Sequence, residues 1–286
     1  MKKIFVFGIL VTLIFGPFIS TVFAGKPDFV AFVDKAKGPV VVTIPDHAVQ
    51  VADDVFSLGS AVVDGKMVQG FLFVHYREGF AKPPWAGSGK GNGETTSYSF
   101  LAKGARWKTT EAYVLDTSNT DGLSDDFVAS RIEASLSEWD VEVSFEIFGN
   151  SDTTTTVDGA DTVNPDDKNE IFFGSIEEPG AIAVTIVWGI FYGPPKAREL
   201  VKYDMVFDDV DFGWGDAGPT NEENLGDTSI MDLQNIATHE IGHAAGMGHP
   251  ADSCTEETMY RFAAWGETKK RTLNTGDIAG IQELYR

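Results

Sequence analysis

Cysteine and basic residues are both scarce in this chain. One of its 286 residues is a cysteine, Cys254, so an intramolecular disulfide is excluded and stability must come from a buried core or from bound ions. The 22 Lys and Arg residues are outnumbered by 43 Asp and Glu residues, which gives a formal net charge of −21. Because nucleic-acid binding needs a basic surface, this balance argues against a nucleic-acid partner.

Long apolar runs are also rare, and the clearest one stands at the start of the chain. Two lysines at positions 2 and 3 precede an apolar run over residues 4–19, and small residues follow at Val22 and Ala24. This pattern predicts a signal peptide over residues 1–24, and hence a secreted, extracellular protein without stable membrane insertion after cleavage. The alternative is an uncleaved membrane anchor, but the run is short for a span of about 20 residues.

The rest of the chain divides into two parts. Residues 25–80 are expected to form a β-rich N-terminal segment, which is either a removable pro-segment or an accessory domain. Residues 81–97 contain two adjacent prolines and a glycine-rich run, which predicts a linker. Residues 98–286 are expected to form the main domain.

The main domain combines two patterns of apolar spacing. Residues 123–139 carry apolar side chains at helical spacing, whereas residues 141–148 largely alternate between apolar and polar, as in a half-buried strand. A loop rich in Thr and Asp follows at 151–167. The other expected elements are strands at 40–42, 60–63, 71–74, 112–115, 170–174, 181–188 and 199–207, and helices at 228–246 and 277–285. Together they predict an α+β fold with a mixed sheet and three helices.

Three of the chain's five histidines are concentrated between His239 and His249. Residues four apart on a helix lie on the same face, so His239 and His243 can bind one ion together. Catalytic zinc takes a third protein ligand and leaves its fourth position to water, and His249 can be that ligand if the chain turns back. Gly246 suits such a turn, because glycine readily adopts the left-handed conformation that ends helices.

Glu240 is placed to act at the same site. A carboxylate beside a water that zinc activates can accept the water's proton and later donate it to the departing amine of a peptide bond. The alternative is that His239 and His243 merely lie on a surface or in a core, and their spacing alone does not exclude this. Gly246, His249 and the downstream Met259 favour the zinc site.

The motif, followed by Thr258, Met259 and Tyr260, resembles the metzincin metalloproteases and specifically their matrixin branch. Segments similar to matrixins also occur at 99–101, 122–124, 180–185, 203–207 and 277–281. The resemblance implies a metzincin-like catalytic domain with a twisted mixed β-sheet, an active-site helix and a C-terminal helix. It also implies that Met259 forms a hydrophobic floor under the zinc. By the same resemblance, the edge strand above the cleft, where a substrate peptide pairs through its backbone, would be formed by Ala181, Ile182, Ala183, Val184 and Thr185.

The chain departs from the matrixin pattern in its histidines and cysteines. Many matrixins carry a second zinc bound by histidines, but here only His47 and His75 lie outside the motif. We therefore expect no second zinc site and interpret both as ordinary polar residues of the β-rich segment. Many matrixins are also kept latent by a propeptide cysteine, yet no cysteine precedes the motif. We interpret Cys254 as a small buried turn residue rather than a zinc ligand, because three histidines already fill the protein positions.

The sequence thus predicts a secreted zinc-dependent endopeptidase that acts as a monomer on protein or peptide substrates. In this prediction, Glu240 is the catalytic base and the zinc ligands are His239, His243 and His249. A function of another class is a zinc-containing surface module that binds peptides without cutting them. Glu240 argues against it, since binding alone needs no base.

The many acidic residues allow two interpretations. The first is a solvated acidic surface that keeps the protein soluble. The second is structural Ca²⁺, because hard oxygen ligands gathered on flexible loops suit that ion. Two loops are rich in such ligands, with Asp152, Asp158, Asp161, Asp166 and Asp167 in one and Asp208, Asp209, Asp211 and Asp216 in the other.

Overall fold

The computed structural model describes residues 40–80, 96–219 and 226–286. The expected signal peptide lies outside these ranges, as do residues 81–95 of the expected linker. All described residues belong to one compact unit, Val33–Arg286. Within the described ranges, no helix is both long and apolar enough to cross a membrane.

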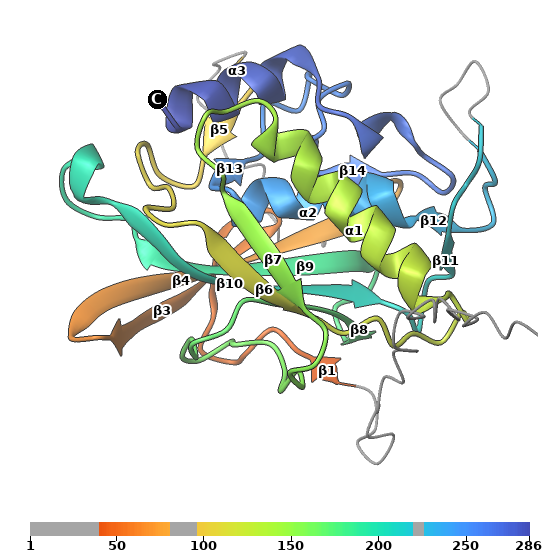
Figure 1. Ribbon diagram of the computed structural model, residues 1–286, viewed down its shortest axis with the longest axis horizontal. Helices are drawn as coiled ribbons and strands as arrows, with labels where there is room; N and C mark the ends of the chain where they lie inside the picture. The colour runs from red at the N-terminus through yellow and green to blue at the C-terminus, as the bar shows by residue number, and fades with distance from the viewer. Residues whose placement is uncertain (1–39, 81–95, 220–225) are drawn as a thin grey trace, which may run out of the picture. The chain divides into compact units, whose positions relative to one another are not determined.

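A large mixed sheet forms the centre of this unit (Figure 1). Its main strands follow the order β2-β3-β4-β9-β10-β8-β6-β7. Neighbours from β2 to β10 in this order are antiparallel, whereas β10, β8, β6 and β7 run parallel to one another. The strands are Val49–Ala52 (β2), Val55–Val63 (β3), Lys66–Arg77 (β4), Glu111–Leu115 (β6), Phe148–Asp152 (β7), Glu170–Ile176 (β8), Ala181–Ile190 (β9) and Glu199–Asp208 (β10).

Six short strands accompany the main sheet. Two of them pair with it, namely β1 (Val41–Val42) beside β8 and β14 (Phe262–Ala263) beside β4. The other four form separate pairs, β5 (Ser99–Phe100) with β13 (Met247–Gly248) and β11 (Trp214–Gly215) with β12 (Met231–Asp232).

Three α-helices pack with the sheet. They are α1 (Asp125–Asp140), α2 (Leu233–Ala244) and α3 (Thr275–Leu284), and short 3-10 helices occur at Pro195–Ala197 (η1) and Lys269–Arg271 (η2). Helix α1 begins after Ser124, whose side chain accepts a hydrogen bond from the N–H of Phe127, one of the groups that a helix start leaves unpaired. Its buried residues recur at helical spacing and define the face toward the sheet, namely Val128, Ile132, Leu136 and Trp139.

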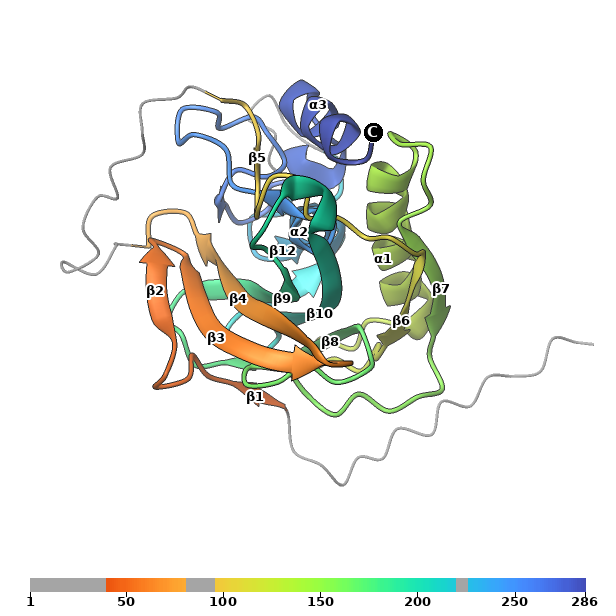
Figure 2. The ribbon, with the colours of Figure 1, turned by 90° about the vertical axis from the view of Figure 1, so that its left-hand side faces the viewer.

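The sheet has a separate hydrophobic core on each face. Helices α1 and α2 pack against each other on one face, and α3 lies beyond α2 (Figures 1 and 2). The core on this face joins Trp139 of α1 and Ile241 of α2 to Phe207 of β10. The opposite face buries Leu72 of β4 and Trp188 of β9. Because both faces remove apolar surface from water, the sheet is held on either side, and the α+β class expected from the sequence is confirmed.

The N-terminal strands continue the sheet of the main domain. Strands β3 and β4 form a hairpin whose turn, Asp64 and Gly65, has positive φ at both positions. Strand β4 then pairs along β9, from Gln69 opposite Gly189 to its last residues. Figure 2 shows this hairpin as a curved extension beside β9 and β10. The two parts of the expected domain division therefore share one sheet, and the removal of the first part stays a prediction.

The strand expected at 141–148 is wrong over most of its length. Residues 141–147 form a turn followed by an irregular bend, and β7 begins only at Phe148. A side-chain oxygen of Asp140 accepts a hydrogen bond from the N–H of Ile147, which folds this stretch back onto the end of α1. The alternation arises because every second residue of this irregular loop, namely Val143, Phe145 and Ile147, directs its side chain to the core.

Helix α2 begins five residues later than the sequence predicted, at Leu233 instead of residue 228. Met231 and Asp232 are extended because they pair with β11. The side chain of Asp232 then accepts a hydrogen bond from the N–H of Asn235 and starts the helix.

Candidate metal centre

Helix α2 brings the first two histidines of the motif together. His239 and His243 lie one turn apart, their ring centroids are 4.9 Å apart, and both side chains are buried. The helix is fixed from α1, because the indole N–H of Trp139 donates to the carbonyl oxygen of Thr238 at 2.8 Å. The two imidazoles therefore project from a rigid helix in the core.

The chain turns back directly after α2, as Gly246 led us to expect. Gly246 has a φ of 103°, and its N–H donates to the carbonyl oxygen of His243 at 2.9 Å. A Cβ at this position would lie 2.9 Å from the carbonyl oxygen of Ala105, so both conformation and space favour glycine. Strand β13 then pairs with β5, and the hydroxyl of Ser99 donates to the carbonyl oxygen of His249 at 2.7 Å. This return brings His249 next to the histidines of α2.

The three imidazoles converge through their Nε2 atoms. The Nε2 of His249 lies 3.0 Å from that of His243 and 3.3 Å from that of His239. Nitrogen ligands about 2.0–2.1 Å from a tetrahedral zinc ion would be about 3.3–3.4 Å apart. The observed spacing therefore fits a single ion to within a few tenths of an ångström.

The Nδ1 atoms of the three rings face oxygen atoms, so the Nε2 atoms remain available to a metal. The Nδ1 atoms of His239 and His243 lie 2.7 Å and 2.9 Å from backbone carbonyl oxygens, and that of His249 lies 3.1 Å from a carboxylate oxygen of Asp54. Because oxygen acceptors require a donor, the Nδ1 atoms of His239 and His243 carry the proton and their Nε2 atoms present lone pairs, and the nearby carboxylate of Asp54 favours the same arrangement in His249. Burial also lowers the pKa of His239 and His243 well below the usual value, which favours the neutral, metal-binding form. Three converging lone pairs repel one another unless a cation lies between them, so the residues fit zinc.

Glu240 extends from the same helix and lies beside the three imidazoles, and we call this group of four side chains the pocket. One carboxylate oxygen accepts a hydrogen bond from the hydroxyl of Thr185 at 2.6 Å, and the other lies 2.9 Å from Nδ1 of His75. A carboxylate oxygen of Glu240 also lies within 4.8 Å of a ring nitrogen of His239. Burial raises the pKa of Glu240 to about 8, against the hydrogen bond from Thr185, and a nearby divalent cation would lower it again. The carboxylate is thus buried beside the converging histidines.

His75 belongs to this pocket, and our interpretation of it as an ordinary polar residue is wrong. It lies in β4 with 1% of its surface exposed, and its ring centroid is 3.9 Å from that of His239. Its Nε2 lies 3.3 Å from the Nζ of Lys270. Burial and the charge of Lys270 lower the pKa of His75 well below the usual value, so its neutral ring donates from Nδ1 to Glu240. A lone histidine in a β-rich segment carries no motif that could have identified it. His47, in contrast, is exposed, as expected.

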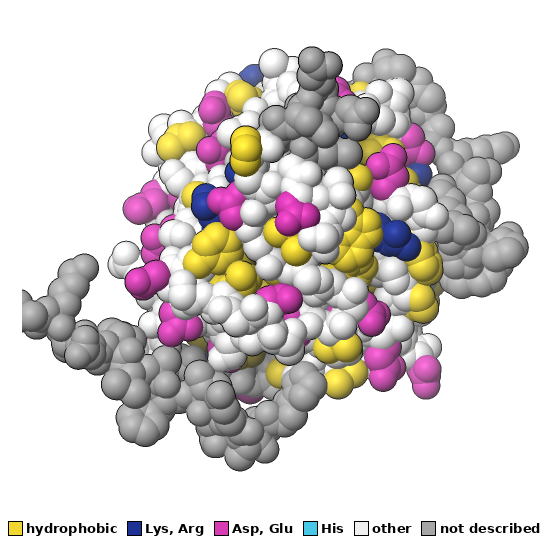
Figure 3. Space-filling view, turned by 90° about the vertical axis from the view of Figure 1, so that its right-hand side faces the viewer, with side chains coloured by type: hydrophobic (Ala, Val, Ile, Leu, Met, Phe, Trp, Pro, Cys, Tyr) yellow, Lys and Arg dark blue, Asp and Glu magenta, His cyan; other side chains and the backbone are white. Residues whose placement is uncertain are grey.

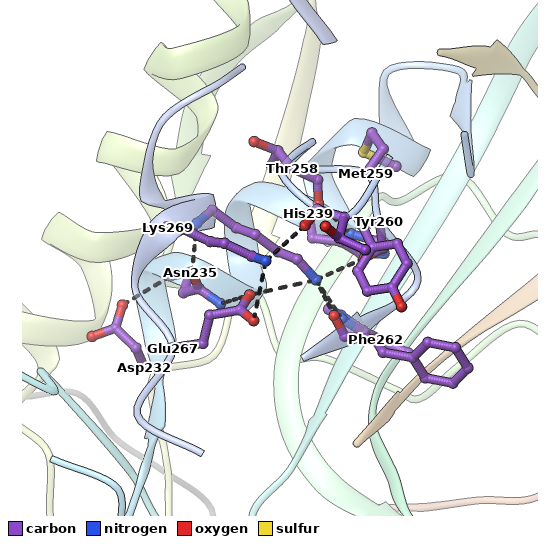
Figure 4. Close-up of polar contacts among 12 residues, drawn as sticks. Asp232, Asn235, His239, Thr258, Met259, Tyr260, Phe262, Glu267 and Lys269 are labelled. Atoms are coloured by element: carbon purple, nitrogen blue, oxygen red, sulfur yellow. Dashed lines mark hydrogen bonds and ion pairs between the residues drawn. The ribbon is translucent and has the colours of Figure 1, made fainter. Parts of the chain in front are cut away.

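Lys270 is a second buried residue that the sequence analysis missed. Its Nζ donates to the carbonyl oxygens of Tyr260 and Phe262 at 2.7 Å and 2.6 Å, and burial lowers its pKa to about 8. Figure 4 shows Tyr260, Phe262 and Glu267 gathered near His239. The lysine therefore holds the segment that follows the motif against the metal-binding helix.

Met259 packs directly against the backbone of α2. A Cβ on Gly242 would lie only 2.2 Å from the sulfur of Met259, so glycine is needed at this contact. The turn is held by Asp277 at the start of α3, whose carboxylate accepts hydrogen bonds from the N–H groups of Thr258 and Met259 at 2.6 Å and 3.2 Å. The carbonyl oxygen of Thr258 in turn accepts from His239 (Figure 4). The role of Met259 as a floor under zinc stays a prediction.

The strand expected to bind substrate is not at an open edge. Ala181 to Thr185 begin β9, which pairs with β10 on one side and with β4 on the other. Opposite each other in the β4–β9 pair are Phe73 and Thr185, and His75 and Ala183. The expectation of an open edge is therefore wrong for this structure, because the sequence pattern of β4 gave no sign of its partner. The substrate-binding role of these residues stays a prediction.

Cys254 and the acid-rich loops lie apart from the histidine site. The sulfur of Cys254 is 3.8 Å from the carbonyl oxygen of Thr96, and within the described ranges this residue is in no group with metal-binding spacing. Such spacing does occur in one acid-rich loop, among Asp158, Asp166 and Glu170. However, the ammonium group of Lys168 lies 2.6–3.4 Å from all three carboxylates. Over the face drawn in Figure 3, Asp and Glu side chains are scattered singly.

Comparison with known proteins gives consistent relatives. The sequence profile of the family described as Matrixin matches residues 133–286. Metalloendoproteinase 1 of Glycine max is 27% identical over 203 residues, which cover 68% of this chain and 57% of that protein. Metalloendoproteinase 2-MMP of Arabidopsis thaliana is 39% identical over 77 residues, 27% of this chain and 19% of that protein. Matrilysin of Homo sapiens is 38% identical over 73 residues, 25% of this chain and 27% of that protein.

These relatives are matched over part of their length, between 19% and 57% for the three proteins. The family profile nevertheless covers more than half of this chain, from within α1 to the C-terminus. This region contains the converging histidines, Glu240 and the turn at Met259. The chain therefore belongs to the matrixin family of the metzincins.

Proposed function

We propose that the protein is a zinc-dependent endopeptidase that hydrolyses peptide bonds in proteins or peptides. The observation that carries the proposal is the convergence of three Nε2 lone pairs, with the Glu240 carboxylate in the same buried pocket. A module that only binds peptides would have no use for a carboxylate held at this point by Thr185. Membership in the matrixin family supports the same reaction class.

The chain's own residues have distinct tasks in this reaction. The zinc ligands are His239, His243 and His249, and zinc, when bound, would polarise the scissile carbonyl and assist attack by water at neutral pH. Glu240 accepts a proton from the attacking water and delivers it to the leaving nitrogen. Thr185 donates to one carboxylate oxygen, which orients the other toward the reacting atoms.

The substrate would lie along β9. We assign backbone recognition to Ala181, Ile182, Ala183, Val184 and Thr185, because strand addition to a sheet edge aligns an extended peptide by its main chain. This assignment requires that β4 be displaced, since β4 now pairs along β9. Met259 would support the metal site from below, where it already packs against Gly242.

The proposal also places the enzyme outside the cell, as a monomer. Secretion is supported by the sequence pattern of residues 1–24, and sequencing the secreted protein should show that it begins at Gly25. A protein that keeps Met1 and stays in the membrane would contradict this.

Structural calcium is a further ion that the sequence suggests. It is supported by the acid-rich loop around Asp158, Asp166 and Glu170, whose oxygens are close enough to share a cation. It is opposed by Lys168, which already supplies a positive charge to all three carboxylates.

Hydrolysis of dye-labelled casein tests the proposed activity. The assay is run on the intact chain and on a chain cut within residues 81–95, because β4 covers β9 in the intact structure. We expect the cut, zinc-loaded protein to hydrolyse casein, to lose this activity with a zinc chelator and to regain it with added zinc. A cut protein that contains zinc, exposes its site and leaves casein intact would refute the proposal.

A further inference from the structure

Strand β4 fills a slot between two strands of the metal-site region. On one side it pairs with β9, and on the other its last residues pair with β14, where Tyr76 and Arg77 lie opposite Phe262 and Ala263. The N–H of Glu78 continues this pairing, donating to the carbonyl oxygen of Ala263 at 2.8 Å. An extended substrate that adds to β9 needs the edge that β4 now occupies.

Two side chains of β4 also cover the groups at the metal site. His75 contacts one oxygen of Glu240 while Thr185 contacts the other, so both carboxylate oxygens are engaged. The ring of Phe73 stacks on His243, with centroids 4.4 Å apart and an interplanar angle of 20°. Glu240 has 0% of its surface exposed, so neither substrate nor bulk water reaches it in this arrangement.

Charged residues hold the N-terminal strands in place. Asp53 pairs with Arg261 at 3.0 Å, and Arg261 lies directly before β14. Asp54 lies 3.1 Å from His249. The contact of Asp54, taken alone, would suit strands that stay in place during catalysis, since a carboxylate on the Nδ1 of a ligating histidine strengthens metal binding. The position of β4 argues against this interpretation, because a peptide cannot reach Glu240 while β4 pairs with β9.

We propose that residues 49–77, strands β2 to β4, are an autoinhibitory element in which β4 takes the place of the substrate on β9 and His75 covers Glu240. This inference rests on the proposed function. Latency of this form needs no cysteine, because β4 occupies the substrate's place on β9 and His75 contacts Glu240. Release of β4 opens β9 and the pocket together.

The expected effect follows from the fraction of molecules in which β4 is displaced. If β4 is displaced in about one molecule in a hundred, the intact chain has about one hundredth of the full activity. A cut within residues 81–95 removes the covalent link to the main domain, so the segment can dissociate on dilution. We therefore expect the cut protein to gain activity as it is diluted.

Gly70 offers a way to displace β4 without touching the metal site. It lies opposite Trp188 in the β4–β9 pair, and a Cβ there would lie 2.7 Å from the indole ring. The ring cannot easily move, because its N–H donates to the carbonyl oxygen of Asp161 at 2.8 Å. Gly70→Val should therefore weaken the pairing of β4 with β9. Val62→Thr is the matched control, since Val62 lies on the adjacent strand β3 with 71% of its surface exposed.

The test compares the intact wild-type chain, the Gly70→Val and Val62→Thr variants, and each of the three after cutting within residues 81–95. Two properties are measured: hydrolysis of dye-labelled casein, and binding of a fluorescent peptide hydroxamate, which needs an open metal site but no catalytic base. We expect the intact wild-type and Val62→Thr proteins to be at least about 100-fold less active than the cut Gly70→Val protein, with hydroxamate binding weakened in parallel.

The outcomes separate this inference from the proposed function. If the intact wild-type chain binds hydroxamate and hydrolyses casein as well as the cut chains do, autoinhibition is refuted and the protease proposal stands. If cutting and Gly70→Val open hydroxamate binding but no casein is hydrolysed, the covering role stands and the protease proposal fails. Should Gly70→Val not fold, as judged by circular dichroism, the cut and diluted wild-type protein still decides between these results.

Discussion

Four histidines share the pocket at the end of α2, but they face different partners. His239, His243 and His249 direct Nδ1 to oxygen acceptors and Nε2 to a common point. His75 does the reverse, since its Nδ1 faces Glu240 and its Nε2 faces the ammonium group of Lys270. The orientation of each ring, set by its neighbours, therefore separates the expected ligands from the residue that contacts Glu240.

Asp54 provides a prediction at this scale. Changing Asp54 to Asn keeps the shape but removes the negative charge 3.1 Å from Nδ1 of His249. The ring then loses a charged partner that strengthens its bond to a metal, so we expect zinc affinity to fall by about 10- to 100-fold, the range seen when such outer partners are lost. Affinity is measured by competition with a chelator of known strength.

Asp53 supplies the matched control for this experiment. Its carboxylate pairs with Arg261 at 3.0 Å, whereas that of Asp54 lies 3.1 Å from Nδ1 of His249. Changing Asp53 to Asn should therefore leave zinc affinity within a few-fold of wild type, even if the segment is held less firmly. Equal losses in the two variants would show that the charge on His249 is not what matters.

At the scale of elements, the sequence identified what depends on local spacing. The helical repeat of Val128, Ile132 and Leu136 predicted α1, and the spacing of His239, His243 and Gly246 predicted the helix and turn of the metal site. These patterns depend on neighbours within a few residues, so the sequence alone carries them.

What the sequence did not reveal depends on contacts between distant segments. Strand β4 was expected as a strand, but its partners β9 and β14 lie more than a hundred residues away in the chain. The role of His75 follows from this pairing, and so does the loss of the open edge at β9. The false strand at 141–147 has a related cause, since tertiary packing made a loop look periodic.

The loop between β7 and β8 gives a prediction about pH. Burial, together with the charges of Asp166 and Asp158, raises the pKa of Asp161 to about 6. In the unfolded chain this pKa is about 3.9, so the folded state binds the proton more tightly. The resulting stabilisation is complete below about pH 3.9 and is lost as the pH rises through about 6.

Changing Asp161 to Asn removes the charge but keeps an oxygen that can accept the hydrogen bond from the N–H of Asp166. We expect the variant to be more stable than wild type at pH 7.5 and to keep only about half of this advantage at pH 5, as measured by urea unfolding in calcium-free buffer. The same comparison with added calcium tests whether Ca²⁺ binds in this loop. If calcium binds in this loop, it should stabilise the wild type and make Asp161→Asn the less stable protein.

For the whole molecule, one continuous sheet carries both the metal site and the segment that covers it. The antiparallel half, β2-β3-β4-β9-β10, includes the N-terminal strands, and α2 packs on its strands β9 and β10. Because β4 lies between β9 and β14, its departure would remove part of the sheet and open the pocket in one step. The net charge of −21 also favours solubility once that edge is exposed.

The central claim is that three histidines bind zinc while Glu240 performs proton transfer. Its most direct test measures zinc content and casein hydrolysis on the same preparations, all cut within residues 81–95 so that β4 can dissociate. Glu240→Gln should keep about one zinc per chain but lose activity by about 100- to 10,000-fold, because the shape remains and the base is gone. His243→Ala should lose both zinc and activity, since it removes a ligand. If Glu240→Gln hydrolysed casein at a rate near wild type, the mechanism would be contradicted even with the zinc in place.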